Sequence, residues 1–175
     1  MATFNRTISR RVYKKRLREG VKYVKIVADL LRIGGFTVET PEQKIRQIRV
    51  KYTSDQGDIH IMAEGKIRFT LEVKSRDLEF TGIEDYPYKS VFIDNVNQWN
   101  YKKHKVAAVI IISQITGKMF VIPLSSRKHW REEEITDREK HDRVQKYMVH
   151  KMHCITFEQL VEKLKVKMGI TNNGK

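Results

Sequence analysis

The alternation of apolar and polar residues along the chain predicts its helices and several of its strands. A long pattern of helical period ends at Gly34-Gly35, a pair that commonly stops a helix. The apolar arc of this pattern is so wide that we expect the helix to pack on more than one side. A near-continuous β-branched run at 106–112 is typical of a strand buried on both faces. Thr156 with Gln159 forms a capping-box pattern that predicts the start of a final helix.

Shorter alternating segments predict further strands, which lie at 36–40, 48–52, 58–63, 66–74 and 118–123. Asp94 or Asn95 is placed to cap a helix that runs to about His104. The segments 76–90 and 127–150 lack a clear period. We therefore expect a loop in the first and a mixture of loop and helix in the second.

The order of these elements predicts a single α/β domain over 1–175, with a mixed central β-sheet flanked by helices. A length of 175 residues is enough for one domain to bury a hydrophobic core of its own. Within this domain we expect a basic N-terminal arm at 1–18 and a charged C-terminal extension at 127–175 that ends in a helix.

The charge balance of the chain bears on its binding partner. The chain has 35 Lys and Arg against 21 Asp and Glu, a net charge of +14. Such an excess predicts a polyanion partner, because Lys and Arg displace counterions from phosphates; a protein that is basic for other reasons is the alternative. No acid occurs between Arg6 and Arg18. The candidate phosphate contacts in this run are Arg10, Arg11, Lys14 and Lys15, and a solvated helix end is the alternative.

Apolar runs and cysteine content bear on where the protein works. The longest apolar run, at 106–112, has seven residues, whereas a membrane span needs roughly 18. We therefore expect no membrane insertion. A single cysteine cannot form an internal disulfide, which fits a reducing, cytoplasmic location. A viral protein that acts inside its host cell meets the same expectation.

The most specific chemical pattern lies on the two strands of the predicted hairpin. Gly57-Asp58-Ile59 stands on one strand and Glu72-Val73-Lys74 on the next, where alternation places Glu72 and Lys74 on one face. A two-residue turn at Glu64-Gly65 would put Asp58 and Glu72 on opposite faces. A three-residue turn puts them on the same face, and only that register buries the apolar positions of both strands together. We therefore expect a three-residue turn, which is either 63–65 or 64–66.

Two carboxylates and an ammonium on one face suggest a metal-dependent reaction. Carboxylates held close together repel each other unless a cation or a proton lies between them. Their oxygens suit a hard divalent ion such as Mg²⁺. Lys74 beside the ion could hold a water or stabilise a developing charge, which together would support hydrolysis of a phosphodiester. Taken alone, the motif also fits an ordinary Glu–Lys pair on a surface hairpin.

Other residues are candidates for the same site. Glu19 falls inside the apolar arc of the first helix, where a buried acid needs a partner such as a metal; a position near the positive end of the helix dipole is the alternative. Gln98 and Tyr101 lie three apart on one helical face. They could touch site water or DNA, and an ordinary place in the core or at the surface is the alternative.

These residues resemble the PD-(D/E)XK nuclease superfamily, which has the restriction-endonuclease-like fold. The resemblance rests on the 57–59 and 72–74 motifs, the preceding helix with Glu19, and the helix and buried strand that follow, and it covers roughly 16–122. Within the superfamily the arrangement is most similar to small Holliday junction resolvases and phage endonucleases. The resemblance implies that Asp58, Glu72 and the Val73 carbonyl bind the metal, that Lys74 acts on the attacking water, and that Glu19 has a supporting role.

The function implied is that of an endodeoxyribonuclease that depends on Mg²⁺, with Mn²⁺ as a substitute, and cuts branched or structured DNA. One alternative is a nuclease of the same fold that acts on linear, nicked or single-stranded DNA. The other is a basic nucleic-acid-binding protein without catalysis. Because a four-way junction presents two symmetric strands, we expect a homodimer. The first helix and Val91-Phe92-Ile93 are its candidate apolar contacts.

Overall fold

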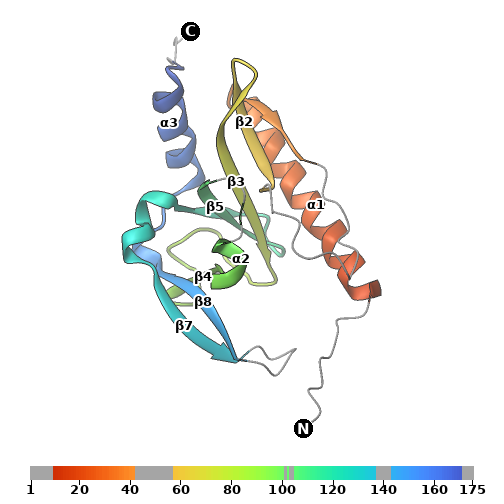
Figure 1. Cartoon of the computed structure of the whole chain (residues 1–175), viewed down its shortest axis with the longest axis vertical. Helices are drawn as coiled ribbons and strands as arrows, with labels where there is room; N and C mark the ends of the chain where they lie inside the picture. The colour runs from red at the N-terminus through yellow and green to blue at the C-terminus, as the bar shows by residue number, and fades with distance from the viewer. Residues whose placement is uncertain (1–9, 42–56, 101, 103–104, 137–142, 171–175) are drawn as a thin grey trace.

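The computed structural model of the chain describes residues 10–41, 57–100, 102, 105–136 and 143–170, with side chains from residue 19 onward (Figure 1). The helices of this part are α1 (Arg10–Ile33), α2 (Val96–Asn100) and α3 (Phe157–Met168), with short 3-10 helices η1 (Leu124–His129) and η2 (Lys151–His153). The strands are β1 (Thr37–Glu39), β2 (Ile59–Ala63), β3 (Lys66–Arg76), β4 (Ser90–Asn95), β5 (Val106–Ser113), β6 (Met119–Pro123), β7 (Arg131–Thr136) and β8 (Arg143–His150).

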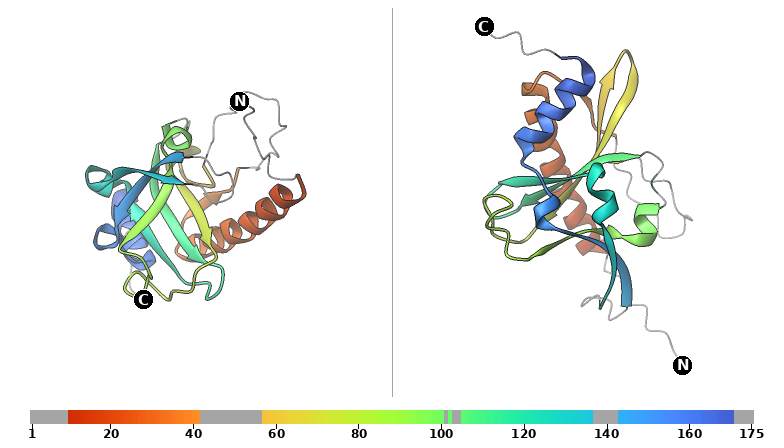
Figure 2. Two further views of the ribbon diagram at one scale, coloured as in Figure 1. Left: turned by 90° about the horizontal axis from the view of Figure 1, so that it is seen from below. Right: turned by 90° about the vertical axis from the view of Figure 1, so that its left-hand side faces the viewer.

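The strands form two sheets that pack face to face. The larger sheet has the order β1-β2-β3-β5-β6 and the smaller one the order β4-β8-β7. The larger sheet is mixed, because β3 pairs with β5 in parallel and its other neighbours are antiparallel. Helices α1 and α3 cover one of its faces, and the smaller sheet covers the other (Figure 2). The α/β class and the mixed central sheet are thus confirmed, although both long helices of the described residues cover the same face.

Helix α1 packs on the larger sheet through one side. Val27 and Leu31 are fully buried, whereas the exposed apolar side chains of its described part are Val21, Ile26, Leu30 and Ile33. The expectation that this helix packs on more than one side is therefore wrong for the described residues, because a flat sheet face covers only one stripe of a helix. None of the described helices, α1 included, is both long and apolar enough to cross a membrane.

Several local signals in the sequence are confirmed. Helix α1 ends before Gly35, which has a φ of 93°, and β5 is buried almost throughout. Helix α3 begins with the capping box of Thr156 and Gln159 and ends at Gly169. A helix, α2, does follow Asp94, but it ends at Asn100 rather than near His104, since Lys102 is not helical. The strand expected at 48–52 lies outside the described residues.

The segment 127–150 differs most from its prediction. In place of loop and helix it contains the second half of η1 and the two antiparallel strands β7 and β8, with 137–142 outside the described residues. Strand β7 is the edge of the smaller sheet and carries a mostly exposed, acidic sequence. Charged side chains are common on edge strands. Because the charged sequence of β7 lacks apolar alternation, the pattern used to predict strands does not detect it.

The register of the β2–β3 hairpin is the one that the apolar pattern requires, but the expected turn is wrong. Ala63 pairs with Lys66, so Glu64-Gly65 is a two-residue turn, and both residues have positive φ. A β-bulge near Ile61 then shifts the register by one residue, so that Ile59 pairs with Leu71. The bulge has the same effect as a longer turn: it buries the apolar positions together and sets Asp58 opposite Glu72.

A second bulge lies in β4, between Phe92 and Asp94. Val91 and Ile93 are both fully buried between the two sheets, and Asp94 is also buried, with 3% of its surface exposed. Regular alternation would place Ile93 and Asp94 on opposite faces. Because a bulge can redirect a side chain, consecutive residues here both lie inside.

Candidate functional site

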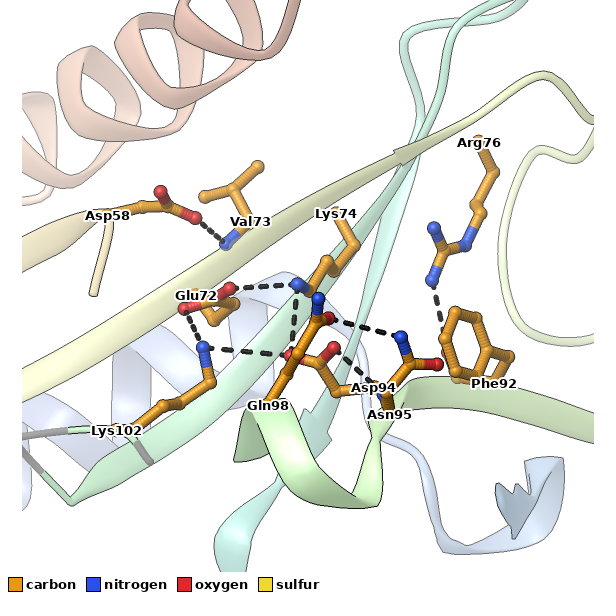
Figure 3. A network of polar contacts seen from close by, with 10 residues as sticks. All are labelled: Asp58, Glu72, Val73, Lys74, Arg76, Phe92, Asp94, Asn95, Gln98 and Lys102. Carbon is orange, nitrogen blue, oxygen red and sulfur yellow. Dashed lines mark hydrogen bonds and ion pairs between the residues drawn. The ribbon is translucent and has the colours of Figure 1, made fainter. Parts of the chain in front are cut away.

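The Asp58 carboxylate lies at the point where β2 begins. The backbone N–H of Asp58 donates to the Leu71 carbonyl at 3.1 Å. The carboxylate Oδ2 of Asp58 accepts a hydrogen bond from the Val73 N–H at 2.8 Å (Figure 3). The N–H and C=O of one strand residue point to the same neighbouring strand. The Val73 carbonyl therefore lies on the edge of β3 that faces Asp58.

Gly57 sets the backbone that carries Asp58. Its φ is +81°, and a Cβ at this position would collide with Cγ2 of Thr70. We expect Gly57→Ala to lower the free energy of unfolding by about 2 kcal/mol or more, because it adds a steric clash to a disfavoured φ. Gly65→Ala is the control, since Gly65 has a φ of +68° with open space around it. A smaller loss of stability for Gly57→Ala than for Gly65→Ala in urea denaturation would contradict this account.

Glu72 and Lys74 project from β3 into the space between the two sheets. Their neighbours on β5 are Val109 and Ile111, which belong to the apolar cluster between the sheets. The Lys74 ammonium lies 2.9 Å from Glu72 Oε1 and 3.1 Å from Asp94 Oδ2, so it joins a carboxylate of the larger sheet to one of the smaller sheet (Figure 3).

Lys102 brings a second ammonium to the same carboxylates. Its Nζ lies 3.0 Å from Glu72 Oε2 and 3.6 Å from Asp94 Oδ2, and only 4% of its side chain is exposed. The residue follows α2, and its backbone N–H donates to the Trp99 carbonyl at 3.2 Å. Lys74, Lys102, Glu72 and Asp94, here called the buried quartet, thus pair two positive with two negative charges.

Opposing effects act on the charge of Lys74. Burial by itself lowers the pKa of this ammonium, but the nearby carboxylates of Glu72, Asp94 and Asp58 outweigh burial, so its pKa lies above the ordinary value for lysine. Lys74 is therefore a cation that donates hydrogen bonds throughout the usual pH range.

The other predicted site residues are not part of this arrangement. The Glu19 side chain is exposed, so the premise that it is a buried acid is wrong, because the sheet buries the stripe of α1 that carries Val27 and Leu31 instead. Gln98 is exposed, and its Oε1 accepts a hydrogen bond from Asn95 Nδ2 at 3.3 Å. Tyr101 lies outside the described residues.

The part of the basic run from Arg10 onward forms the start of α1. The structure places the backbone from Arg10 onward in this helix, while residues 1–9 and the side chains of 10–18 lie outside what it describes. The first turn of α1 contains no acidic residue. Cations at this end of a helix oppose its dipole, so the run does not serve the stability of the helix.

Asp94 and Lys102 are the site residues that sequence reasoning missed. The sequence pattern presents Asp94 only as a helix cap, and its Oδ1 does accept a hydrogen bond from the Asn95 N–H at 2.9 Å. The burial of Asp94 depends on the β4 bulge, which the local sequence pattern does not predict. The one sequence signal for Lys102 is its place just after the predicted helix, where nothing distinguishes it from the neighbouring Lys103.

The donor set offers a divalent cation two carboxylates and a backbone carbonyl. Glu72 Oε2 is a buried oxygen that accepts no hydrogen bond of suitable geometry, and its neighbour in Figure 3 is the Lys102 ammonium. Asp58 directly precedes Ile59, and Glu72 directly follows Leu71, the residue with which Ile59 pairs. These oxygens fit the ligand chemistry of Mg²⁺, although the described residues contain no group of three His, Cys, Asp or Glu side chains placed to hold a metal. Water would complete the coordination, as is usual for Mg²⁺.

Comparisons of the sequence with protein-family models and with curated proteins found no match.

Proposed function

We propose that the protein is a Mg²⁺-dependent endodeoxyribonuclease with the restriction-endonuclease-like fold, acting on branched DNA as Holliday junction resolvases do. The observation that carries the proposal is the contact of Asp58 Oδ2 with the Val73 N–H, beside Glu72 and Lys74. This contact joins the two motifs, because it sets Asp58 of 57–59 against the backbone of 72–74, in which the Glu72 and Lys74 side chains are in contact with each other. The element order supports it as well, since a helix precedes this hairpin and a short helix and a buried strand follow.

In the proposed nuclease, Asp58, Glu72 and the Val73 carbonyl would hold the divalent cation. When bound, the cation would act as a Lewis acid and activate a water molecule. The Val73 N–H fixes the orientation of the Asp58 carboxylate. The Lys74 ammonium donates hydrogen bonds toward the attacked phosphate or the water, and stabilises the negative charge that develops there. Asp94 of the smaller sheet holds Lys74 in place, and Lys102, which follows α2, holds Glu72.

One observation favours a second candidate, a nucleic-acid-binding protein without catalysis. The buried quartet is balanced in charge without any metal. A purely structural role, that of joining the two sheets, would therefore account for it. The two candidates differ in metal affinity: the nuclease binds Mg²⁺ at Asp58 and Glu72, and the binding protein does not. Titration calorimetry of wild type and Asp58→Asn with Mn²⁺ separates them.

The substrate is tested with a cleavage panel of four-way junction, flap, nicked, linear and single-stranded DNA, each with Mg²⁺ or Mn²⁺. We expect the junction to be cut in preference to linear duplex, because the proposed enzyme recognises branched DNA. Ca²⁺ is the control metal: it accepts oxygen ligands with looser geometry than Mg²⁺, so it should support binding without turnover. Similar rates on all duplexes would replace the resolvase with a general endonuclease of the same fold.

The basic start of α1 predicts a specific response to salt. Replacing Arg10, Arg11, Lys14 and Lys15 together by Ala should weaken binding to every DNA about equally, because phosphate contacts carry no sequence information. The slope of log K against log salt should flatten by about 0.9 for each duplex phosphate that the variant no longer neutralises. The control replaces exposed lysines elsewhere, namely Lys66, Lys89, Lys118 and Lys128. If both quadruple variants flatten the slope equally, the start of α1 has no special role.

A homodimer would place two such sites on one junction, and α1 offers the contact surface. Ile26 and Leu30 are 36% and 37% exposed on the side of α1 that the sheet leaves uncovered. The other contact surface predicted from the sequence, Val91-Phe92-Ile93, is wrong, because Val91 and Ile93 are fully buried in the chain's own core. We expect light scattering at micromolar concentration to show a dimer that Ile26→Glu converts to monomer. A wild-type monomer, with and without junction DNA, would contradict the homodimer.

A further inference from the structure

A groove lies on the face of the larger sheet that is turned away from the buried quartet. It has a volume of about 660 Å³ and is bounded by α3, η1 and the first residues of β3 and β5. Its apolar walls include Phe69, Leu160 and Leu164, which belong to the cluster beneath α1 and α3. The groove is therefore separate from the proposed active site, which faces the smaller sheet.

The charged residues that line this groove are all basic. They come from the larger sheet, from η1 and from α3, and they are Arg68, Lys105, Arg127, Lys163 and Lys167. No Asp or Glu lines the groove in the described part of the chain. Lys105 and Lys163 are exposed and form no ion pair with another described residue, so their charges are directed to solvent or to a ligand.

We propose that this groove binds an acidic peptide segment of a partner protein, with apolar side chains in the groove and carboxylates at its basic rim. An apolar floor inside a charged rim is the usual anatomy of a peptide-binding site. A nucleic-acid base fits less well, because Ser125 is the only uncharged side chain with a hydroxyl or amide in the lining that the described residues form, so the polar edges of a buried base would lose their hydrogen bonds. A fatty acid has one carboxylate, whereas the basic residues are distributed over three elements.

The test uses a fluorescein-labelled short peptide in which Asp and Glu alternate with Leu and Phe, measured by fluorescence anisotropy in EDTA. One control peptide has Ser at the apolar positions, and the other has Asn and Gln at the acidic positions. We expect each control to bind at least about tenfold more weakly than the parent peptide, because each removes one half of the recognition. The absence of metal keeps this result independent of the proposed nuclease activity.

Two variants place the peptide in the groove. Lys105→Glu with Lys163→Glu reverses two rim charges, and Ser125→Trp fills the groove without changing the charge; each should weaken the parent peptide at least about tenfold. The matched control is Lys89→Glu with Lys118→Glu, which changes the net charge equally at exposed residues away from the groove. Urea denaturation checks that every variant is folded. If the Lys105→Glu, Lys163→Glu double variant does not fold, Ser125→Trp still tests the proposal.

Several results would overturn the proposal. Equal weakening by the control pair would show that only net charge matters, and tight binding of the serine peptide would show that the apolar walls are not used. Unlabelled oligothymidine or dodecanoate serves as a competitor. If Ser125→Trp weakens the binding of one of these compounds but not that of the peptide, the groove is a site for nucleic acid or for an acyl chain instead.

Discussion

The Asp58→Asn variant is expected to fold like the wild type and to lose Mg²⁺-dependent DNA cleavage by on the order of a thousandfold. An asparagine Oδ1 can still accept the hydrogen bond from the Val73 N–H, so the local geometry is kept while the negative charge is lost. A neutral amide is a much weaker ligand for a hard divalent cation than a carboxylate, and without the cation the water is not activated. The measurement is the single-turnover cleavage rate on a four-way junction.

Asp85→Asn is the matched control for this variant. The Asp85 carboxylate also accepts backbone N–H bonds in a loop, from Thr81 and Gly82, and it lies outside the proposed site. We expect Asp85→Asn to cleave at the wild-type rate, and Asp58→Asn to bind junction DNA in EDTA at least as tightly as the wild type, because it carries one negative charge fewer near the phosphates. Wild-type cleavage by Asp58→Asn would end the assignment of a nuclease.

Replacing Lys102 by methionine is expected to lower the free energy of unfolding by about 3–5 kcal/mol. The change leaves Glu72 Oε2 buried without the ammonium that lies 3.0 Å from it, and an uncompensated buried charge is strongly destabilising. Methionine keeps most of the side-chain volume, so the loss reports charge rather than a cavity. Urea denaturation at neutral pH gives the value.

The double variant Lys102→Met with Glu72→Gln identifies the cause. If the charge of Glu72 is responsible, the double variant is more stable than the sum of the single changes predicts, since neither partner is then left alone. Removal of Lys102 should also strengthen cation binding at the carboxylates, so Mn²⁺ should raise the melting temperature of Lys102→Met more than that of the wild type. Additive stabilities and equal shifts in melting temperature would contradict an ion pair between Lys102 and Glu72.

The parts of the fold that follow from neighbouring residues could be predicted, and those that depend on distant pairing could not. The buried run of β5 and the capping box of α3 are local signals that survive in the structure. The smaller sheet has no such signal, because β8 lies between β4 and β7 and its pairing with β4 joins segments far apart in the chain. The acidic sequence of β7 looks like a solvated loop until that sheet is known.

The candidate site divides in the same way. Alternation along β3 is enough to put Glu72 and Lys74 on one face, and their ammonium–carboxylate contact is present. The side on which Asp58 falls could be inferred only from the demand to bury apolar residues, which the chain meets with a bulge instead of a longer turn. Asp94 reaches the site through the β4 bulge, and Lys102 through the position of α2. The local sequence indicates neither the β4 bulge nor the contact of Lys102 with Glu72.

The pairing of β4 with β8 has a consequence for the order in which the protein matures during translation. A domain generally folds as a unit while synthesis delivers its N-terminal residues first, and β4 is synthesised long before the strand with which it pairs. In a nascent chain that ends before β8, Val91 and Ile93 lack the partner strand beside which they are buried. Asp94 is then not held against Lys74 and Lys102. The residues of the hairpin with Asp58 and Glu72 are thus synthesised early, whereas the finished site requires the chain up to His150.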